Sequence, residues 1–258
     1  MVWGLASIGR VFLSFLASIG RLTLFLTHAL SQGLRPPYYS RQLVRQFFEI
    51  GYLSLPVVGL TAFFTGMVLA LQSYTGFSRF NAENAIASVV VLSITRELGP
   101  VLGGLMVAGR IGASIAAEIG TMRVTEQIDA LISLSTSPQK YLIAPRLLAG
   151  VIVLPLLVIV ADTIGVLGGY VISVYRLDFN SAAYLKQTFD FMHMEDVTSG
   201  LIKAAVFGFI IALMGCYHGF NSKGGAEGVG KATTQAVVSS SILILIANYF
   251  LTSLLFEH

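Results

Sequence analysis

Charged residues inside otherwise apolar stretches are the positions of this sequence best suited to chemistry. Arg96 and Glu97 are adjacent and stand just before Gly99-Pro100. Neighbouring residues on a helix point about 100° apart, so the two side chains cannot satisfy each other alone, and at least one needs a partner on another element. Because burying an unpaired charge is costly, we interpret Arg96 and Glu97 as functional residues, with a structural ion pair as the alternative.

Asp162 and Lys203 also interrupt apolar stretches. A backbone or hydroxyl group can satisfy Asp162, and the long side chain of Lys203 can reach polar surroundings from a helix end. The single cysteine, Cys216, excludes a thiol-based metal site within one chain. The histidines show no ligand spacing; they are His28, His193, His218 and His258. We therefore expect no metal site, and no nucleophile–base or paired-carboxylate pattern indicates catalysis.

The segment 225–232, GAEGVGKA, nearly matches a phosphate-binding P-loop. The motif requires serine or threonine after the lysine to hold Mg²⁺, and that position is Ala232. A P-loop also joins a strand to a helix, whereas this segment follows an apolar helix. We predict a flexible loop here that does not bind nucleotide.

The elements that hold these residues must be membrane-spanning helices. Hydrophobic residues make up 55% of the 258 positions and charged residues only 11%, against about 25% charged in a soluble domain. The mean hydropathy is +0.79. The apolar runs exceed 18 residues and lack the alternation of a membrane β-barrel. The composition predicts an all-α integral membrane protein.

Five spans are expected, forming one transmembrane domain over residues 51–258. The second is too long for one straight crossing, since 32 helical residues measure about 48 Å against a hydrocarbon core of roughly 30 Å. Part of it must therefore project beyond the core, tilt or break, and Pro100 is the position at which we expect a break. The predicted spans are residues 51–74, 86–117, 147–174, 200–217 and 236–256.

Residues 1–50 are expected to lie outside the spans. LASIGR occurs at 5–10 and again at 16–21, which places Arg10 and Arg21 on one helix face. We predict an amphipathic helix in the membrane interface, with a signal peptide as the alternative, followed by a short surface helix over 38–49. Lysine and arginine number ten on the amino-terminal side of the predicted spans and three on the other. The amino terminus is therefore expected in the cytoplasm and the carboxyl terminus outside.

Two features follow one another at the end of the second span. Small residues recur every four positions and form a ridge that allows close helix packing, within one chain or across a homodimer seam. The ridge comprises Gly104, Ala108, Gly112, Ala116 and Gly120. Residues 121–133 then set Met122, Ile128 and Leu131 against charged Arg123, Glu126 and Asp129. This pattern predicts a short amphipathic surface helix between the second and third spans.

Several motifs, spread over nearly the whole chain, resemble the MlaE-type permeases of the Mla (maintenance of lipid asymmetry) transporters. They are GMVLALQ at 66–72, RELGP at 96–100, AGR at 108–110, AEIG at 117–120, MRVTEQ at 122–127 and KATT at 231–234. The resemblance implies a homodimeric permease of the bacterial inner membrane, with the 121–133 helix as its cytoplasmic coupling helix. The chain would bind no cofactor, because ATP and Mg²⁺ belong to a partner ATPase pair. A STAS-domain subunit, a hexameric MCE-domain protein outside and phospholipid as cargo complete the implied system.

The resemblance, with the depth of the residues in the spans, implies two contact sites. An outward-facing lipid site would be built from Leu69, Gln72, Phe77, Phe80, Arg96, Glu97 and Lys203. The ATPase contact would be built from Met122, Arg123, Glu126, Gln127 and Leu131. Val158 is expected to face the bilayer instead. Two alternatives stay open: an ion-coupled transporter or channel with Asp162, Arg96 and Glu97 as a relay, and a membrane enzyme acting on lipid.

Overall fold

The computed structural model describes residues 2–33, 39–80 and 85–256, and within these ranges the chain forms helices and turns and no strand. The short elements are α2 (Ser40–Ile50), η1 (Tyr52–Ser54), η2 (Ser78–Phe80), α7 (Gln127–Ser133), η6 (Gln139–Ile143) and α9 (Ser181–Phe191). The long ones are α1 (Val2–Gly33), α3 (Leu55–Phe77), α8 (Ala144–Tyr175), α10 (Met194–Phe220) and α11 (Gly225–Phe256). The second span combines α4 (Ile86–Ser93), η4 (Ile94–Leu98), α5 (Gly99–Val107), η5 (Ala108–Gly112) and α6 (Ala113–Val124).

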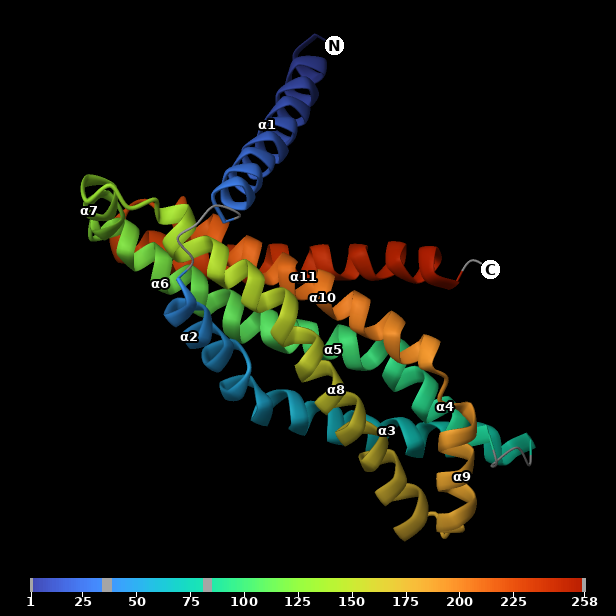
Figure 1. The fold of residues 1–258 in the computed structure, drawn as a ribbon. Coiled ribbons are helices and arrows are strands. Elements are labelled where there is room, and N and C mark those ends of the chain that lie inside the picture. Colours follow the sequence, from blue (N-terminus) through green and yellow to red (C-terminus); the bar gives the residue numbers. More distant parts are fainter. Residues whose placement is uncertain (1, 34–38, 81–84, 257–258) are drawn as a thin grey trace.

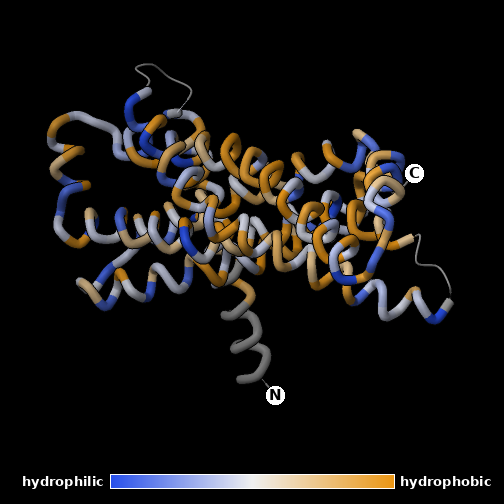
Figure 2. The backbone as a smooth tube through the Cα atoms, turned by 90° about the horizontal axis from the view of Figure 1, so that it is seen from below, coloured by the Kyte–Doolittle hydropathy of each residue, from blue (hydrophilic) through white to orange (hydrophobic). Residues whose placement is uncertain are grey.

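The long helices form an elongated bundle with short helices at its two ends (Figure 1). In Figure 1, α1, α2 and α7 gather at one end of the bundle and α9 lies at the other, while α11 diverges from the bundle toward its carboxyl end. Apolar residues dominate the long helices, and polar residues concentrate near their ends and on the short helices (Figure 2). This distribution is typical of helices that cross a membrane.

Among the described residues, six helical stretches are long and apolar enough to cross a membrane, one more than the five expected as spans. The additional stretch is Phe12–Gly33 in α1. This helix packs on the bundle through one face, formed by Leu22, Phe25, Leu26 and Ala29. The Phe25 ring lies 5.6 Å from that of Tyr217 and 5.8 Å from that of Phe220, both in the last turn of α10. The carboxyl-terminal part of α1 therefore meets the end of the bundle, and the rest of the helix projects away from it (Figure 1).

Of the three outcomes expected for the long second span, a break at Pro100 is not found. The span continues as helix through two π-helical turns, η4 and η5, and ends at Val124. The reason is steric and local: proline has no N–H and clashes with the carbonyl four residues earlier, and widening the preceding turn accommodates both.

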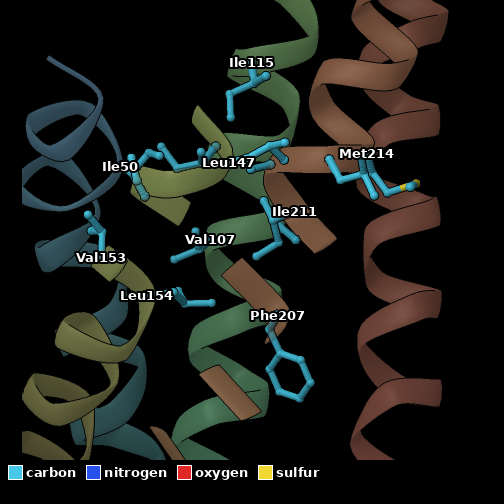
Figure 3. Close-up of a cluster of buried hydrophobic side chains, with 14 of the residues drawn as sticks. Ile50, Val107, Ile115, Leu147, Val153, Leu154, Phe207, Ile211 and Met214 are labelled. Carbon is cyan, nitrogen blue, oxygen red and sulfur yellow. The ribbon is translucent and has the colours of Figure 1, made fainter. Parts of the chain in front are cut away.

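Backbone contacts between glycines set the tightest helix crossings, and the sequence analysis missed them. A Cβ atom added at Gly66 of α3 would collide with the carbonyl oxygen of Gly165 in α8. One added at Gly208 of α10 would collide with the carbonyl oxygen of Gly150 in α8. Around the Gly150–Gly208 crossing, a core of buried apolar side chains joins α2, α5, α6, α8 and α10, including Ile50, Val107 and Phe207 (Figure 3).

Three local expectations need correction. The near-P-loop segment is not a flexible loop: α11 already begins at Gly225, and Glu227 and Lys231 form an ion pair of 2.7 Å within its first turns. The surface helix predicted over 121–133 is shorter, because 121–124 still belong to α6 and Glu126, with a φ of 60°, turns the chain before α7. Val158 does not face the bilayer, since it is fully buried.

Candidate functional site

A buried polar network surrounds Glu97 where η4, α10 and α11 meet. Oε1 of Glu97 accepts from Nζ of Lys203 at 2.6 Å and from Oγ1 of Thr252 at 3.0 Å. Oε2 of Glu97 accepts from Nδ2 of Asn248 at 3.0 Å. The Lys203 side chain is fully buried, whereas about a third of the Glu97 side chain is exposed. The carboxylate is thus held at the edge of the network, with one side open.

Lys203 also donates a hydrogen bond to a carbonyl before Pro100 that lacks its usual helical donor. In an α-helix the carbonyl of Arg96 would accept from the N–H of residue 100, which proline lacks. Nζ of Lys203 donates to this carbonyl at 3.0 Å. The same ammonium donates to Oγ1 of Thr252 at 2.8 Å. A buried lysine is thereby satisfied by three acceptors, which matches its three donors.

The Arg96 side chain points to a different partner. Its Nε lies 3.1 Å from Oδ1 of Asp196 in the first turn of α10, and Asp196 is buried. About a third of the Arg96 side chain stays exposed. Arg96 and Glu97 therefore each bind a separate element, in agreement with the expectation that at least one of them needs a partner elsewhere.

The sequence analysis did not assign Asn248, Thr252 or Asp196 to this site. Asn248 and Thr252 stand four residues apart in the apolar run of the fifth span, so they share one helix face. A polar stripe of this kind in a spanning helix was the available signal, since such residues face a protein interior.

The other residues predicted for a lipid site lie in different surroundings. Leu69 and Phe77 are partly buried against a second apolar cluster, formed by Ala70, Ile86, Val90, Ile94 and Ile172. Gln72 is exposed. The side chain of Phe80 lies outside the described part of the structure. Within one chain, Leu69 and Phe77 thus pack toward α4 and α8, whereas Glu97 bonds to α10 and α11.

A second charged network joins α2, α6 and α8 near α1. Oε2 of Glu118 pairs with Nη2 of Arg146 at 2.7 Å, and Oε1 lies 3.9 Å from Nη2 of Arg45. Arg110 donates to Oγ of Ser54 at 2.8 Å and to the carbonyl of Glu49 at 3.1 Å. These bonds connect the AGR and AEIG motifs to α2 and to the start of α3, and we interpret them as structural.

The ridge of small residues is buried inside the chain. Gly104 faces Phe207 of α10 and Ile244 of α11, and the Ala116 carbonyl lies 2.9 Å from a Cβ built at Gly219. Ala108 and Ala116 are fully buried, and Gly112 is buried between α10 and α11. The described contacts of the ridge therefore lie within one chain.

The residues predicted to contact an ATPase divide between two elements. Met122 and Arg123 end α6, and Arg123 pairs with Asp129 of α7 at 2.8 Å. Met122 and Leu131 are partly buried against the core, and Ile128 is fully buried. Glu126 and Gln127 are exposed, as are the apolar side chains of Ile132 and Leu134 beyond them.

Asp162 lies apart from the Glu97 network. A Cβ built on Gly99 would collide with its Oδ1, so the carboxyl packs against the backbone of the second span. That oxygen has no hydrogen-bond partner among the described residues. Within the same residues, no group of three histidine, cysteine, aspartate or glutamate side chains forms a cluster that could hold a metal ion.

Long apolar helices that enclose two charged networks define a multi-pass membrane protein. The chain belongs to the MlaE permease family, described as "Permease MlaE", which matches residues 43–254. It is 61% identical to a probable ABC transporter permease protein of Rickettsia felis over 97% of each chain. It is 44% identical to a probable ABC transporter permease protein of Synechocystis over 84% of this chain and 82% of the relative.

A relative with a more specific name is the intermembrane phospholipid transport system permease protein MlaE of Haemophilus influenzae. It is 33% identical to this chain over 98% of the chain and 97% of the relative. The chain is therefore a permease subunit of an ABC transporter and a multi-pass inner-membrane protein, and such permeases work with a separate ATPase that binds the nucleotide.

Proposed function

We propose that this permease moves glycerophospholipid between the inner membrane and the periplasm and thereby maintains the lipid asymmetry of the outer membrane. The Haemophilus relative, named for phospholipid transport, supports the cargo. The observation that carries the proposal is the buried network around Glu97. It holds Glu97 and Arg96 partly exposed in the distorted part of the second span, where a polar head group can be bound while acyl chains stay among apolar helices.

The residues of the proposed lipid site divide among several roles. Arg96 is anchored by Asp196 and keeps part of its guanidinium accessible, so it can bind a phosphate oxygen. Lys203 fixes the position of Glu97 and the helix around it. Leu69, Phe77 and Phe80 are proposed to contact acyl chains, and Gln72, which is exposed, to contact the head group or glycerol region. Because the Leu69 and Glu97 surfaces differ within one chain, the site is proposed to be completed across a homodimer.

The proposed assembly places α7 against the ATPase. A homodimer of this chain would bind an ATPase pair that holds ATP and Mg²⁺, with a STAS-domain subunit on the same side and an MCE-domain hexamer on the periplasmic side. The exposed Glu126 and Gln127 would orient the contact, with Arg123 and the nearby face of Met122 and Leu131 supporting it. The ten-to-three distribution of lysine and arginine supports a cytoplasmic amino terminus and α7, and a periplasmic carboxyl terminus.

The test is lipid transfer by the full chain reconstituted with its ATPase in vesicles that contain a fluorescent phospholipid. Glu97→Gln removes the charge of the head-group site and Arg96→Gln removes the phosphate ligand. Both are expected to reduce ATP-dependent transfer by about tenfold or more, because one charge-assisted contact is worth at least about 1.4 kcal/mol.

The matched control is Glu227→Gln, which removes a carboxylate from the exposed Glu227–Lys231 pair and should leave transfer unchanged. A photo-crosslinker at Gln72 should capture phospholipid in an ATPase-dependent manner, whereas one at Ile159, exposed on α8, should capture it regardless of ATPase activity. Normal transfer by both site variants would contradict the proposal.

A further inference from the structure

An apolar groove lies between the end of α1, the start of α2 and the first turns of α8. Its volume is about 470 Å³, within the range of roughly 300–1,000 Å³ that small-molecule sites occupy. Apolar side chains dominate its lining: Ala29 and Leu30 of α1, Leu43 of α2, Ala144, Pro145, Leu147, Leu148 and Val151 of α8, and Phe209 of α10. None of these residues belongs to the Glu97 network or to the proposed lipid-transfer site.

The groove adjoins an exposed apolar face of α8. Leu148 lines the groove and is half exposed. It begins a row of exposed apolar residues along one face of α8 that continues through Ile152, Leu156 and Ile159. A pocket continuous with the apolar face of a spanning helix is accessible to the acyl chains of the surrounding leaflet.

The polarity of the lining changes along the groove. Lys140 and the hydroxyl-bearing residues Tyr39 and Ser40 line it together with the first turn of α8, and the lining ends among apolar residues at Val151. Ala144 and Val151 are seven residues apart on one helix, or about 10 Å. Ser40 is also the first residue of α2, an eleven-residue helix without a side-chain cap, and the amino-terminal N–H groups of a helix favour an anion.

We propose that this groove binds one acyl chain of a membrane phospholipid whose phosphate lies between Lys140 and the amino-terminal end of α2. The lysine and the helix end supply positive charge at the mouth, and the apolar lining takes the chain. This lipid is not the transported one: it stays bound and holds α1 and α2 against α8. The inference does not rest on the proposed transport function.

The test uses the full chain with its ATPase in vesicles of phosphatidylethanolamine and phosphatidylglycerol that contain a phosphatidylglycerol with a photoactivatable acyl chain. After illumination, mass spectrometry locates the labelled peptides. Adducts are expected within residues 144–151 with and without ATP. Val151→Trp fills the inner end of the groove and should lower this labelling by about tenfold, as expected for the loss of one well-packed contact region.

Leu156→Trp, on the same exposed face of α8 but outside the groove, is the matched control and should keep wild-type labelling. Lys140→Gln should lower the capture of the anionic probe several-fold, and it stays informative if Val151→Trp does not fold. Glu97→Gln should lose transfer yet keep the groove label, which separates the two proposals. Absence of adducts in 144–151, or equal labelling in all variants, would overturn the inference.

Discussion

At the scale of single residues, the ammonium group of Lys203 satisfies two polar groups of the second span, the Arg96 carbonyl and the Glu97 carboxylate. Pro100 leaves the carbonyl of Arg96 without its helical donor, and Lys203 supplies the replacement while it neutralises Glu97. All three N–H bonds of Lys203 have acceptors in fixed directions, at Glu97, Arg96 and Thr252. Arginine cannot reproduce this arrangement, because its planar donors point in a fork.

Lys203→Met is therefore expected to destabilise the protein strongly. The change removes the cation that pairs with the Glu97 carboxylate and the donor that bonds to the Arg96 carbonyl. Breaking a buried ion pair from one side costs about 3–5 kcal/mol. The measurement is the free energy of unfolding of the purified chain in mixed micelles. Lys231→Met is the control, because it removes the same side chain from an exposed pair and should change little.

A double-mutant cycle with Glu97→Gln separates pairing from packing. If the Lys203–Glu97 bond carries the effect, Lys203→Met should cost less in the Glu97→Gln background, with a coupling energy of about 0.5–3 kcal/mol. Strictly additive effects of the two substitutions would show that the pair is not coupled.

At the scale of helices, hydropathy predicts where the spans lie but not how they touch. The third span was expected over 147–174 and forms α8 from Ala144 to Tyr175, whereas the fifth begins at Gly225 and not near residue 236. The first turns of α11 carry Glu227 and Lys231, so apolarity could not detect them. The ridge through Gly112 is visible from its four-residue spacing. The pairing of Gly150 with Gly208 is not, because it depends on the relative register of two helices distant in sequence.

Gly208→Ala is expected to be more harmful than any single alanine on the ridge. Its Cβ would meet the backbone of Gly150, which cannot move without shifting α8, so the cost should be about 1–3 kcal/mol or more. At Gly112 the nearest atom to such a Cβ is at 3.7 Å, so alanine fits there and only a larger side chain such as leucine should disrupt packing. Thermal unfolding compares these variants with Gly109→Ala, which has open space for its methyl group. An unchanged stability of Gly208→Ala would refute the crossing.

In the turn between α6 and α7, the backbone strain at Glu126 can be measured separately from the proposed contact of its side chain with the ATPase. Glu126 has a φ of 60°, a left-handed conformation that costs a non-glycine residue about 1 kcal/mol, so Glu126→Gly should fold at least as stably as the wild type. If Glu126 contacts the ATPase, the same variant should bind the ATPase about tenfold more weakly, as measured by titration in nanodiscs. Ser135→Gly relieves the same strain after α7, at a φ of 56°, and should bind normally. Equal binding by both variants would remove Glu126 from the contact.

At the scale of the whole molecule, α1 decides whether the chain crosses the membrane five or six times. Length and apolarity alone permit Phe12–Gly33 to span. At 100° per residue, however, the exposed polar side chains of Ser14, Ser18, Arg21 and His28 fall on one arc of the helix, and exposed Phe12, Leu16 and Ile19 fall on another. Thr23 and Thr27 lie on or beside the second arc, and their hydroxyls donate to carbonyls of the helix itself. Arg21 would also stand near the centre of the bilayer in a spanning helix, at a cost of about 2.5–3.5 kcal/mol. The contact of Phe25 with the last turn of α10 favours an interfacial position as well.

An interfacial α1 predicts that two nearby positions will differ sharply in their surroundings. Ser18→Cys should react with a water-soluble maleimide applied to the cytoplasmic side, and Leu16→Cys should be protected from it, because Leu16 faces the acyl chains. Cys216 is buried, so it should contribute little background. Nitroxide labels at the two positions provide a control for their depth in the membrane. Dissolved oxygen should relax the label at position 16 more strongly, and an aqueous nickel chelate should relax the label at position 18 more strongly. A spanning α1 would place both positions at similar depth, and protection of both from aqueous reagents on either side would establish six crossings instead of five.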